Sequence, residues 1–309
     1  DENGKPIDVY QKEGKEANWL IEEFMLLANK AVAELVSKEM KLKDPIFVYR
    51  IHENPNSEKI DAIRNIAGIF GHQLGETNTP KNISTTLNKL LKDVKGKPEE
   101  GVLEMLALRS MARARYSTEN VGHYGLAFKY YTHFTSPIRR YPDMMVHRLL
   151  ATYLDHSRPQ DRWEECCKYS SQREQLATEA ERASTKYKLV EFMQDKIGVE
   201  FEGKVSGLTE WGMYVEIEPT KIEGMVPLRE IKSDYYIFDE DTFTLRGKSS
   251  GRQYTIGSPV KVKVLRANLE QKLLDYQLVE EDLPTNTEKD NFNTKSNPKT
   301  FKGSNRKRK

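Results

Sequence analysis

Apolar residues in the first half of the chain recur at helical spacing. Between residues 18 and 40 they return every three or four positions, with Glu and Lys between them, as in an amphipathic helix. Two shorter runs, 47–51 and 126–131, are rich in aromatic and β-branched residues and predict strands. Helices are expected over residues 18–40, 58–71, 99–116 and 163–195, with another beginning at Pro80.

The pattern changes near residue 197 from helical spacing to alternation. Apolar and polar residues alternate in segments such as 199–205 and 259–265, and glycine-containing turns separate the segments. Several short strands joined in this way are typical of a small barrel. The sequence thus predicts an α+β protein, mostly helical over residues 1–196 and a β-barrel over 197–280.

Residues 281–309 differ from both parts. They are rich in Pro, Asn, Thr and Lys, hold almost no apolar residues and end in Asn-Arg-Lys-Arg-Lys. Such a segment cannot bury enough apolar surface to fold, so we expect a disordered basic tail. The tail would add salt-sensitive, nonspecific affinity for a polyanion. The alternative is a tail that only keeps the protein in solution.

Composition limits the function classes. The chain has 309 residues, of which 37% are hydrophobic and 31% charged, and its net charge of +2 does not by itself indicate nucleic-acid binding. No apolar run approaches the ~20 residues of a membrane span. The two cysteines, Cys166 and Cys167, are adjacent, which excludes a disulfide scaffold and favours a reduced, cytoplasmic setting.

The strongest chemical signal is the segment Tyr131-Thr-His-Phe-Thr-Ser-Pro-Ile-Arg-Arg-Tyr-Pro-Asp143. Its two prolines prevent a long regular helix between them. Arg139 and Arg140 lie in this loop, beside hydroxyl side chains and ahead of a helix N-terminus whose free amides attract anions. The segment predicts a phosphate-binding loop. The alternative is a surface arginine pair near a turn.

The same segment, preceded by Gly122-His-Tyr-Gly-Leu-Ala127, resembles the signature of the RNB catalytic domain of the ribonuclease II and ribonuclease R family. The resemblance runs from about residue 1 to about residue 280. It implies a processive, hydrolytic exoribonuclease that degrades single-stranded RNA from its 3′ end and releases nucleoside 5′-monophosphates. Association with ribosomes and a monomeric state are further expectations.

The resemblance also implies residue roles. Arg139 is expected to stabilise the scissile phosphate, and Arg140 to brace the loop beside the RNA. In the run Ile-Glu-Glu-Phe the family places a glutamate that contacts the sugar near the RNA 3′ end, which we assign to Glu23, with Glu22 the alternative. Glu181 is expected close to the RNA path. The other interpretations are helix-dipole stabilisation for the first glutamate and a solvated helix face for Glu181.

The predicted helix 99–116 becomes basic towards its end. Arg109 and Arg113 are four residues apart and would share one face, where their charges repel each other unless a polyanion lies against them. We therefore expect an RNA-facing stripe of Arg109, Arg113 and Tyr116. The alternative is that the arginines complement the helix dipole.

The second part contains, in order, Gly-x-Val, Trp-Gly-Met-Tyr-Val and Glu-Gly-Met-Val-Pro, and so resembles the RNA-binding OB domain repeated in ribosomal protein S1. The resemblance implies a five-stranded OB-fold barrel. Trp211 and Tyr214 are expected to stack on bases, and Lys204 to contact phosphates. Phe201 is a third candidate, and at least one of the three rings is expected in the barrel core.

The RNB resemblance implies that hydrolysis uses Mg²⁺ held by clustered aspartates after an Ile-Asp-Pro segment. This sequence has neither that segment nor an Asp-x-Asp-Asp run, and it begins without Met. We therefore expect part of a longer enzyme whose metal ligands lie outside this chain, and a chain that alone binds RNA without cleaving it. The alternatives are a noncatalytic RNA-binding paralogue and a ribosome- or messenger-associated OB protein with a helical scaffold.

Overall fold

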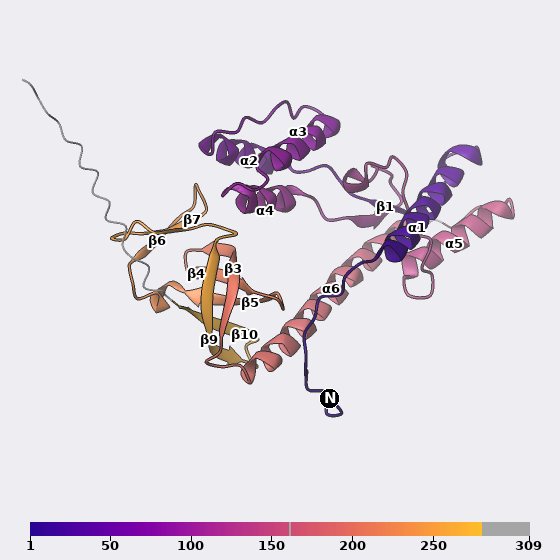
Figure 1. Cartoon of the computed structure of the whole chain (residues 1–309). Helices are drawn as coiled ribbons and strands as arrows, with labels where there is room; N and C mark the ends of the chain where they lie inside the picture. The colour runs from indigo at the N-terminus through magenta and orange to yellow at the C-terminus, as the bar shows by residue number, and fades with distance from the viewer. Residues whose placement is uncertain (161, 280–309) are drawn as a thin grey trace, which may run out of the picture. The chain divides into compact units, whose positions relative to one another are not determined.

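The computed structural model describes residues 1–160 and 162–279 (Figure 1). The tail predicted over residues 281–309 lies outside the described residues. Within them, no helix has the length and apolar character needed to cross a membrane.

Six α-helices form most of the first part. Asn56 caps the second by accepting a hydrogen bond from the Glu58 amide at 2.8 Å, and Thr79 caps the third in the same way from Asn82 at 3.2 Å. The helices are α1 (Glu16–Glu34), α2 (Ser57–Ile69), α3 (Pro80–Asp93), α4 (Glu100–Ser110), α5 (Tyr141–Leu154) and α6 (Trp163–Gln194), and a π-helical turn (Leu35–Glu39) extends α1.

A two-stranded sheet corrects the predicted end of the fourth helix. The helix expected to reach residue 116 ends at Ser110, and Arg115–Ser117 forms β2, antiparallel to β1 (Tyr49–Ile51). Arg50 pairs with Tyr116 in this register. The backbone hydrogen bonds of the strand pair replace those of one further helical turn, a tertiary effect that spacing alone does not reveal.

The strand predicted over 126–131 is also absent. Tyr124–Leu126 forms a 3₁₀ turn instead, and Ala127 follows it with a left-handed φ of 55°. This backbone turns back so that the Phe128 carbonyl accepts a hydrogen bond from the His123 amide at 2.8 Å. The predicted β1 is confirmed, although it is shorter than expected.

Two buried clusters hold the helical part together. One joins β1 to α5, and the other joins α2, α3 and α4. Their largest fully buried side chains are Phe47, Ile51, Met145 and Leu149 in the first and Ile60, Ile63 and Leu103 in the second.

Helix α1 buries only part of its apolar surface. Asn29 and Ala33 are buried, while the apolar side chains earlier in the helix face solvent. These exposed side chains are Trp19, Leu20, Ile21, Phe24 and Leu27.

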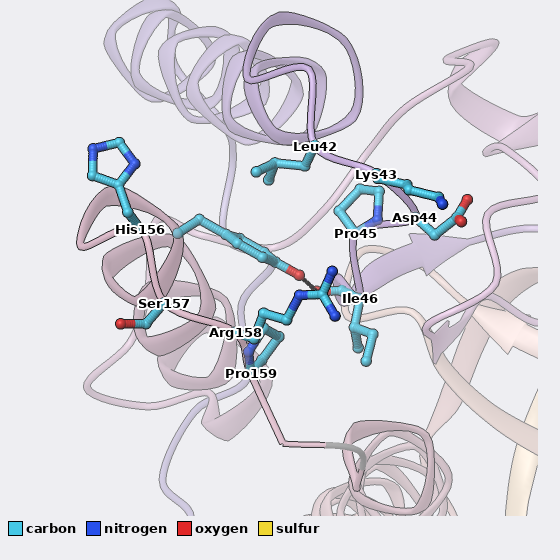
Figure 2. Close-up of a pocket in the computed structure, with 10 residues that line it drawn as sticks. Leu42, Lys43, Asp44, Pro45, Ile46, His156, Ser157, Arg158 and Pro159 are labelled. Carbon is cyan, nitrogen blue, oxygen red and sulfur yellow. Dashed lines mark hydrogen bonds between the residues drawn. The ribbon is translucent and has the colours of Figure 1, made fainter.

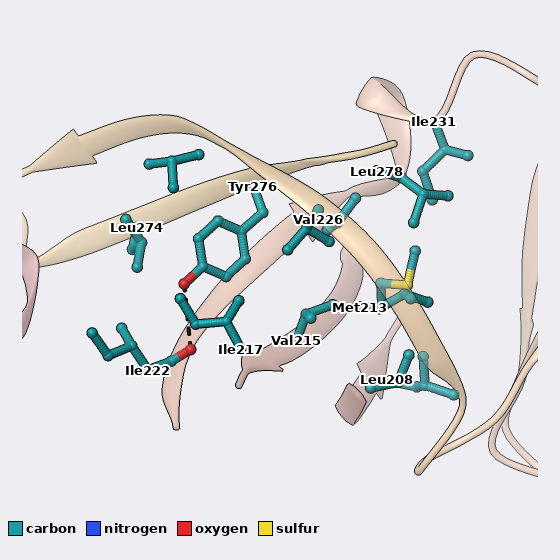
Figure 3. Close-up of a cluster of buried hydrophobic side chains, with 14 of the residues drawn as sticks. Leu208, Met213, Val215, Ile217, Ile222, Val226, Ile231, Leu274, Tyr276 and Leu278 are labelled. Carbon is teal, nitrogen blue, oxygen red and sulfur yellow. Dashed lines mark hydrogen bonds between the residues drawn. The ribbon is translucent and has the colours of Figure 1, made fainter. Parts of the chain in front are cut away.

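The second part is the predicted closed five-stranded barrel, with strand order β10-β5-β4-β3-β9. Figure 3 shows its core, in which the Tyr276 hydroxyl donates to the Ile222 carbonyl at 3.3 Å. Val190 and Met193 near the end of α6 belong to the same buried cluster. The barrel strands are β3 (Glu200–Thr209), β4 (Gly212–Ile217), β5 (Ile222–Pro227), β9 (Pro259–Asn268) and β10 (Leu273–Leu278).

A separate three-stranded antiparallel sheet is inserted between β5 and β9. It consists of β6 (Tyr236–Asp239), β7 (Thr244–Gly247) and β8 (Gln253–Tyr254). Tyr236 and Leu245 on its inner face belong to the barrel core cluster, so this sheet packs on the barrel.

Two glycine substitutions should change stability in opposite directions. A Cβ at Gly212 would collide with the Val226 carbonyl oxygen and approach the Pro227 Cα to 3.1 Å, whereas a Cβ at Gly68 in α2 meets no atom within 4 Å. We expect Gly212→Ala to lower the free energy of unfolding by about 1–3 kcal/mol because backbone must move. Gly68→Ala should raise it by up to about 1 kcal/mol. Denaturant titration measures both, and two shifts of the same sign would contradict this packing.

Candidate RNA-binding and catalytic site

The loop before α5 is built around a buried carboxylate. Asp143 has 0% of its surface exposed, and its Oδ2 accepts hydrogen bonds from the Ser136 amide and from Arg140 Nη2, both at 2.8 Å. The Ser136 carbonyl accepts from the amides of Arg139 and Arg140, which closes a tight turn. Pro142 then occupies the first turn of α5. The conformation of the loop is therefore fixed by residues of the same segment, Ser136, Arg140, Pro142 and Asp143.

The two adjacent arginines have different surroundings. Arg140 is partly buried and paired with Asp143 at 2.8 Å, as its predicted bracing role requires. The Arg139 side chain is exposed and makes no hydrogen bond or ion pair with any residue that the structure describes. Arg139 is thus held by its neighbours and left open to an anion.

Arg139 borders a cavity of about 260 Å³ between the loop and α1. Of the two glutamates considered for the sugar contact, Glu22 lines this cavity and Glu23 does not. The structure therefore brings the alternative, Glu22, close to Arg139. The other lining residues are Met25, Leu26, Asn29, Tyr131, His133, Thr135, Ser136 and Arg140.

Asn29 connects α1 to the loop and was not predicted. Its Oδ1 accepts hydrogen bonds from the amides of Phe134 at 2.9 Å and Thr135 at 3.2 Å, and its Nδ2 donates to the Tyr131 hydroxyl at 3.2 Å. An amide side chain within the apolar stripe of a helix is the signal that could have identified it. Asn29 sets the position of the cavity wall that carries Arg139.

Tyr116 is packed rather than open. Only 3% of its surface is exposed, its ring lies 4.6 Å under the Arg50 guanidinium, and a hydrogen bond of 2.8 Å joins its hydroxyl to His133 Nδ1. Arg50 also donates to Glu174 on α6 at 2.6 Å. The ring that was expected to face RNA is covered, and Arg50 and Glu174, which the sequence reasoning missed, lie around it.

Two histidines, His133 in the cavity wall and His123 against the Tyr131 ring, stay neutral at physiological pH. Burial, with the nearby positive charges of Arg140 and Arg50, lowers the pKa of His133 to about 3. Burial, with His52 and Arg50, lowers the pKa of His123 to about 4. Neither ring brings a positive charge towards phosphate, so the cationic groups of the site are arginines.

Arg109 and Arg113 do not form the predicted helix stripe. Helix α4 ends at Ser110, so Arg113 lies beyond it and the two side chains share no helical face. Both are exposed. They remain candidates for phosphate contact as separate surface charges.

Glu181 lies on α6 where this helix meets the barrel. It lines a cavity of about 490 Å³ together with Arg182 and Lys186 of the same helix and with Lys221 and Glu223 of the barrel. It does not line the cavity of Arg139. Leu189, Val190, Ile222 and Leu274 also line this cavity, so charged side chains stand around a largely apolar surface.

The three aromatic residues considered for base stacking on the barrel differ in how far they are exposed to solvent. Trp211 has 72% of its surface exposed in the turn between β3 and β4, and Tyr214 on β4 is partly exposed. Phe201 packs against the barrel core, as expected of at least one ring. Lys204 on β3 is exposed, 3.9 Å from the Glu218 carboxylate.

A second cavity, of about 630 Å³, contains none of the predicted site residues (Figure 2). It lies between the segment 42–46 and the residues after α5, where Figure 2 shows Arg158 and Pro159. The Tyr153 hydroxyl donates to the Ile46 carbonyl at 2.7 Å within it.

No metal site is evident in residues 1–160 and 162–279. They contain no group of three or more His, Cys, Asp or Glu side chains placed to hold an ion. The Mg²⁺ expected of the complete enzyme therefore finds no fitting ligand set among these residues.

Comparison with known proteins identifies both parts of the chain. The model of the RNB domain matches residues 1–156, and that of the S1 RNA binding domain matches residues 194–275. Ribonuclease R 1 of Lactococcus lactis subsp. lactis is 39% identical over 289 residues, which are 91% of this chain and 35% of that protein. The chain thus spans about a third of this relative's length.

Solved structures agree with the sequence comparison. The apo form of Mycoplasma genitalium RNase R superposes with a TM-score of 0.76 at 26% identity, over 90% of this chain and 44% of that one. The same enzyme in complex with ribose methylated single-stranded RNA gives a TM-score of 0.75 at 26% identity, with the same coverage. Since the RNB domain model covers half of its residues, the chain belongs to the RNB domain family.

Proposed function

We propose that this chain works in the hydrolytic, processive 3′→5′ degradation of RNA, as part of a longer polypeptide of the ribonuclease R type. The observation that carries the proposal is the separation of roles between two adjacent arginines. Arg140 is held by the buried Asp143, while Arg139 projects, unpaired among the described residues, at a cavity beside α1.

The chemistry proposed for Arg139 is electrostatic. A guanidinium presents a planar set of donors that matches two phosphate oxygens, and it can stabilise the charge that develops when the scissile bond breaks. Its position is set before RNA arrives, since the Ser136 turn and the Arg140–Asp143 pair fix the backbone on both sides. A group that needs no rearrangement is more effective in the transition state.

The remaining residues are proposed to guide RNA. Glu22, or Glu23 as first predicted, would contact the sugar near the 3′ end, since Glu22 shares a cavity with Arg139. Trp211, Tyr214 and Lys204 would bind the single strand on the barrel, with Glu181, Arg109 and Arg113 along its path. Mg²⁺ belongs to the proposal only for the longer polypeptide, as do a cytoplasmic location, ribosome association and a monomeric state.

The second candidate function is noncatalytic RNA binding. The observation that favours it is that the groups needed to hold a single strand, an exposed Trp211 with Tyr214 and Lys204 near it in sequence, are all present in the barrel. A paralogue that only protects or tethers RNA needs nothing more. The two functions differ in whether the polypeptide that carries this chain releases mononucleotides.

The 309-residue chain by itself should bind RNA without cleaving it. We expect a labelled oligouridine to bind in fluorescence anisotropy with an affinity that falls as salt rises, because phosphate contacts release counterions. Incubation with Mg²⁺ should leave the oligonucleotide intact on a denaturing gel. Released mononucleotides would contradict the expectation of an inactive chain, and absence of any binding would contradict the RNA-guiding role.

A further inference from the structure

The outer face of the inserted sheet β6–β8 combines an exposed ring, Tyr235, an exposed apolar side chain, Ile237, and two cations. Alternation along β6 places Tyr236 inward and its neighbours Tyr235 and Ile237 outward, and both neighbours are exposed. The register pairs Ile237 with Arg246 on β7, and Arg246 with Gln253 on β8. The amide of Lys248 donates to the Tyr235 carbonyl at 2.9 Å, which brings these two residues together at the end of the sheet.

Hydrogen bonds to Asp234 fix the backbone next to Tyr235 on this face. The Asp234 carboxylate, one residue before Tyr235, accepts hydrogen bonds from the amides of Ser249 at 2.9 Å and Ser250 at 2.6 Å. The hydrogen bonds from Ser250 and from nearby amides hold the pKa of Asp234 well below its ordinary value, so the carboxylate stays charged and keeps the turn closed. Tyr235, with 71% of its surface exposed, thus stands on a fixed backbone.

Two cations of this face form no ion pair. They are Arg246 and Lys248, both exposed, and neither is paired with a residue that the structure describes. The Gln253 amide oxygen, in the orientation that satisfies both groups, accepts from Arg246 Nε at 3.0 Å and directs that guanidinium across the sheet. The acidic residue of β6, Asp239, caps the β6–β7 turn by accepting from the amides of Asp241 and Thr242. Hydrogen bonds from Thr242 and, to a smaller extent, the positive charge of Arg246 lower the pKa of Asp239.

We propose that the outer face of β6–β8 is a second RNA-contact surface, distinct from that of Trp211 and Tyr214, which binds single-stranded RNA by stacking a base on Tyr235 and holding phosphates with Arg246 and Lys248. An exposed aromatic ring beside exposed cations suits single strands, because every unpaired base has a face to stack and every nucleotide a phosphate. A duplex offers no free base face to Tyr235. The inference rests on the proposed function, since it presumes that the chain binds RNA.

The test measures binding of labelled oligouridine by the 309-residue chain in buffer with EDTA. The double variant Tyr235→Ala/Lys248→Ala should raise the dissociation constant about tenfold, and Tyr235→Phe, which keeps the ring, should leave it unchanged. Lys248→Ala alone should reduce the slope of log affinity against log salt by about 0.7. The matched control is Lys168→Ala/Tyr169→Ala, which removes an exposed cation and an exposed ring from α6.

The outcomes separate this surface from the proposed function. An unchanged dissociation constant in Tyr235→Ala/Lys248→Ala, while Trp211→Ala weakens binding, would overturn the second surface and leave the proposed function in place. An equal loss of affinity for an oligouridine–oligoadenine duplex, or for the Lys168/Tyr169 control, would overturn the assignment of base stacking to Tyr235. A wild-type chain that binds no RNA would overturn the proposed function itself. Thermal unfolding of each variant verifies that the exposed substitutions leave the fold intact.

Discussion

Arg139→Ala, introduced into the ribonuclease R-type polypeptide to which we assign this chain, should lower turnover by about 10²–10³-fold and leave the dissociation constant for RNA within about twofold. The reason is that Arg140 stabilises the loop through Asp143, whereas Arg139 is free to contact the substrate. The Arg139 side chain makes no hydrogen bond or ion pair with a described residue, so the fold should survive its removal. An interaction made mainly in the transition state changes turnover more than binding. Single-turnover degradation of labelled RNA, with anisotropy for affinity, measures both quantities.

Arg148 provides the matched control for Arg139. It lies on α5, close in sequence to the loop, and its side chain is exposed in the same way. Arg148→Ala should leave turnover unchanged, because general positive charge near RNA affects affinity and its salt dependence rather than the chemical step. Equal turnover in wild type and Arg139→Ala would remove the proposed role, and an equal fall in affinity and turnover would make Arg139 a binding residue only.

Asp143→Ala should produce the largest loss of stability. The wholly buried carboxylate holds both the Ser136 amide and Arg140 Nη2, and its removal leaves two donors without their acceptor. Removing one partner of a buried pair costs about 3–5 kcal/mol, and we expect the lower end because Arg140 is partly exposed. The free energy of unfolding from denaturant titration is the quantity to measure.

Asp143→Asn tests the charge of this side chain. One amide oxygen can still accept from both Ser136 N–H and Arg140 Nη2, as Oδ2 does, while the negative charge opposite Arg140 is lost, so we expect a smaller loss of about 1–2 kcal/mol. A double-mutant cycle with Arg140→Ala should show a coupling of at least about 1 kcal/mol. Additive losses would mean that the two side chains do not stabilise each other and that something else fixes the loop.

The sequence predicted much of the fold because helices, turns and strands depend mainly on interactions between residues that are close in the chain. Apolar spacing located five of the six helices in the described residues, and the loop before Tyr141 predicted the start of the sixth. Alternation with glycine turns located the barrel, confirmed by its strand order. The loop of Arg139 and Arg140 was likewise recognisable, because two prolines and an acidic residue in the first helical turn act over only a few residues.

What the sequence could not show depends on partners far along the chain. The end of α4 at Ser110 depends on a strand pairing between Arg50 and Tyr116. The contact of Arg50 with Glu174 joins residues 124 positions apart, and Asn29 reaches Phe134 across 105 positions. No window of neighbouring residues contains these contacts. For the same reason helical spacing did not decide between the neighbouring residues Glu22 and Glu23. Only Glu22 lines the cavity.

The uncovered apolar side of α1 has a practical consequence. Five large side chains, Trp19, Leu20, Ile21, Phe24 and Leu27, face water on one helix. Attraction between such surfaces strengthens on warming and in sulfate or phosphate, and weakens on cooling. Cold, dilute solutions without those anions should therefore preserve the colloidal stability of the purified polypeptide, whereas salting-out steps would draw molecules together through this helix.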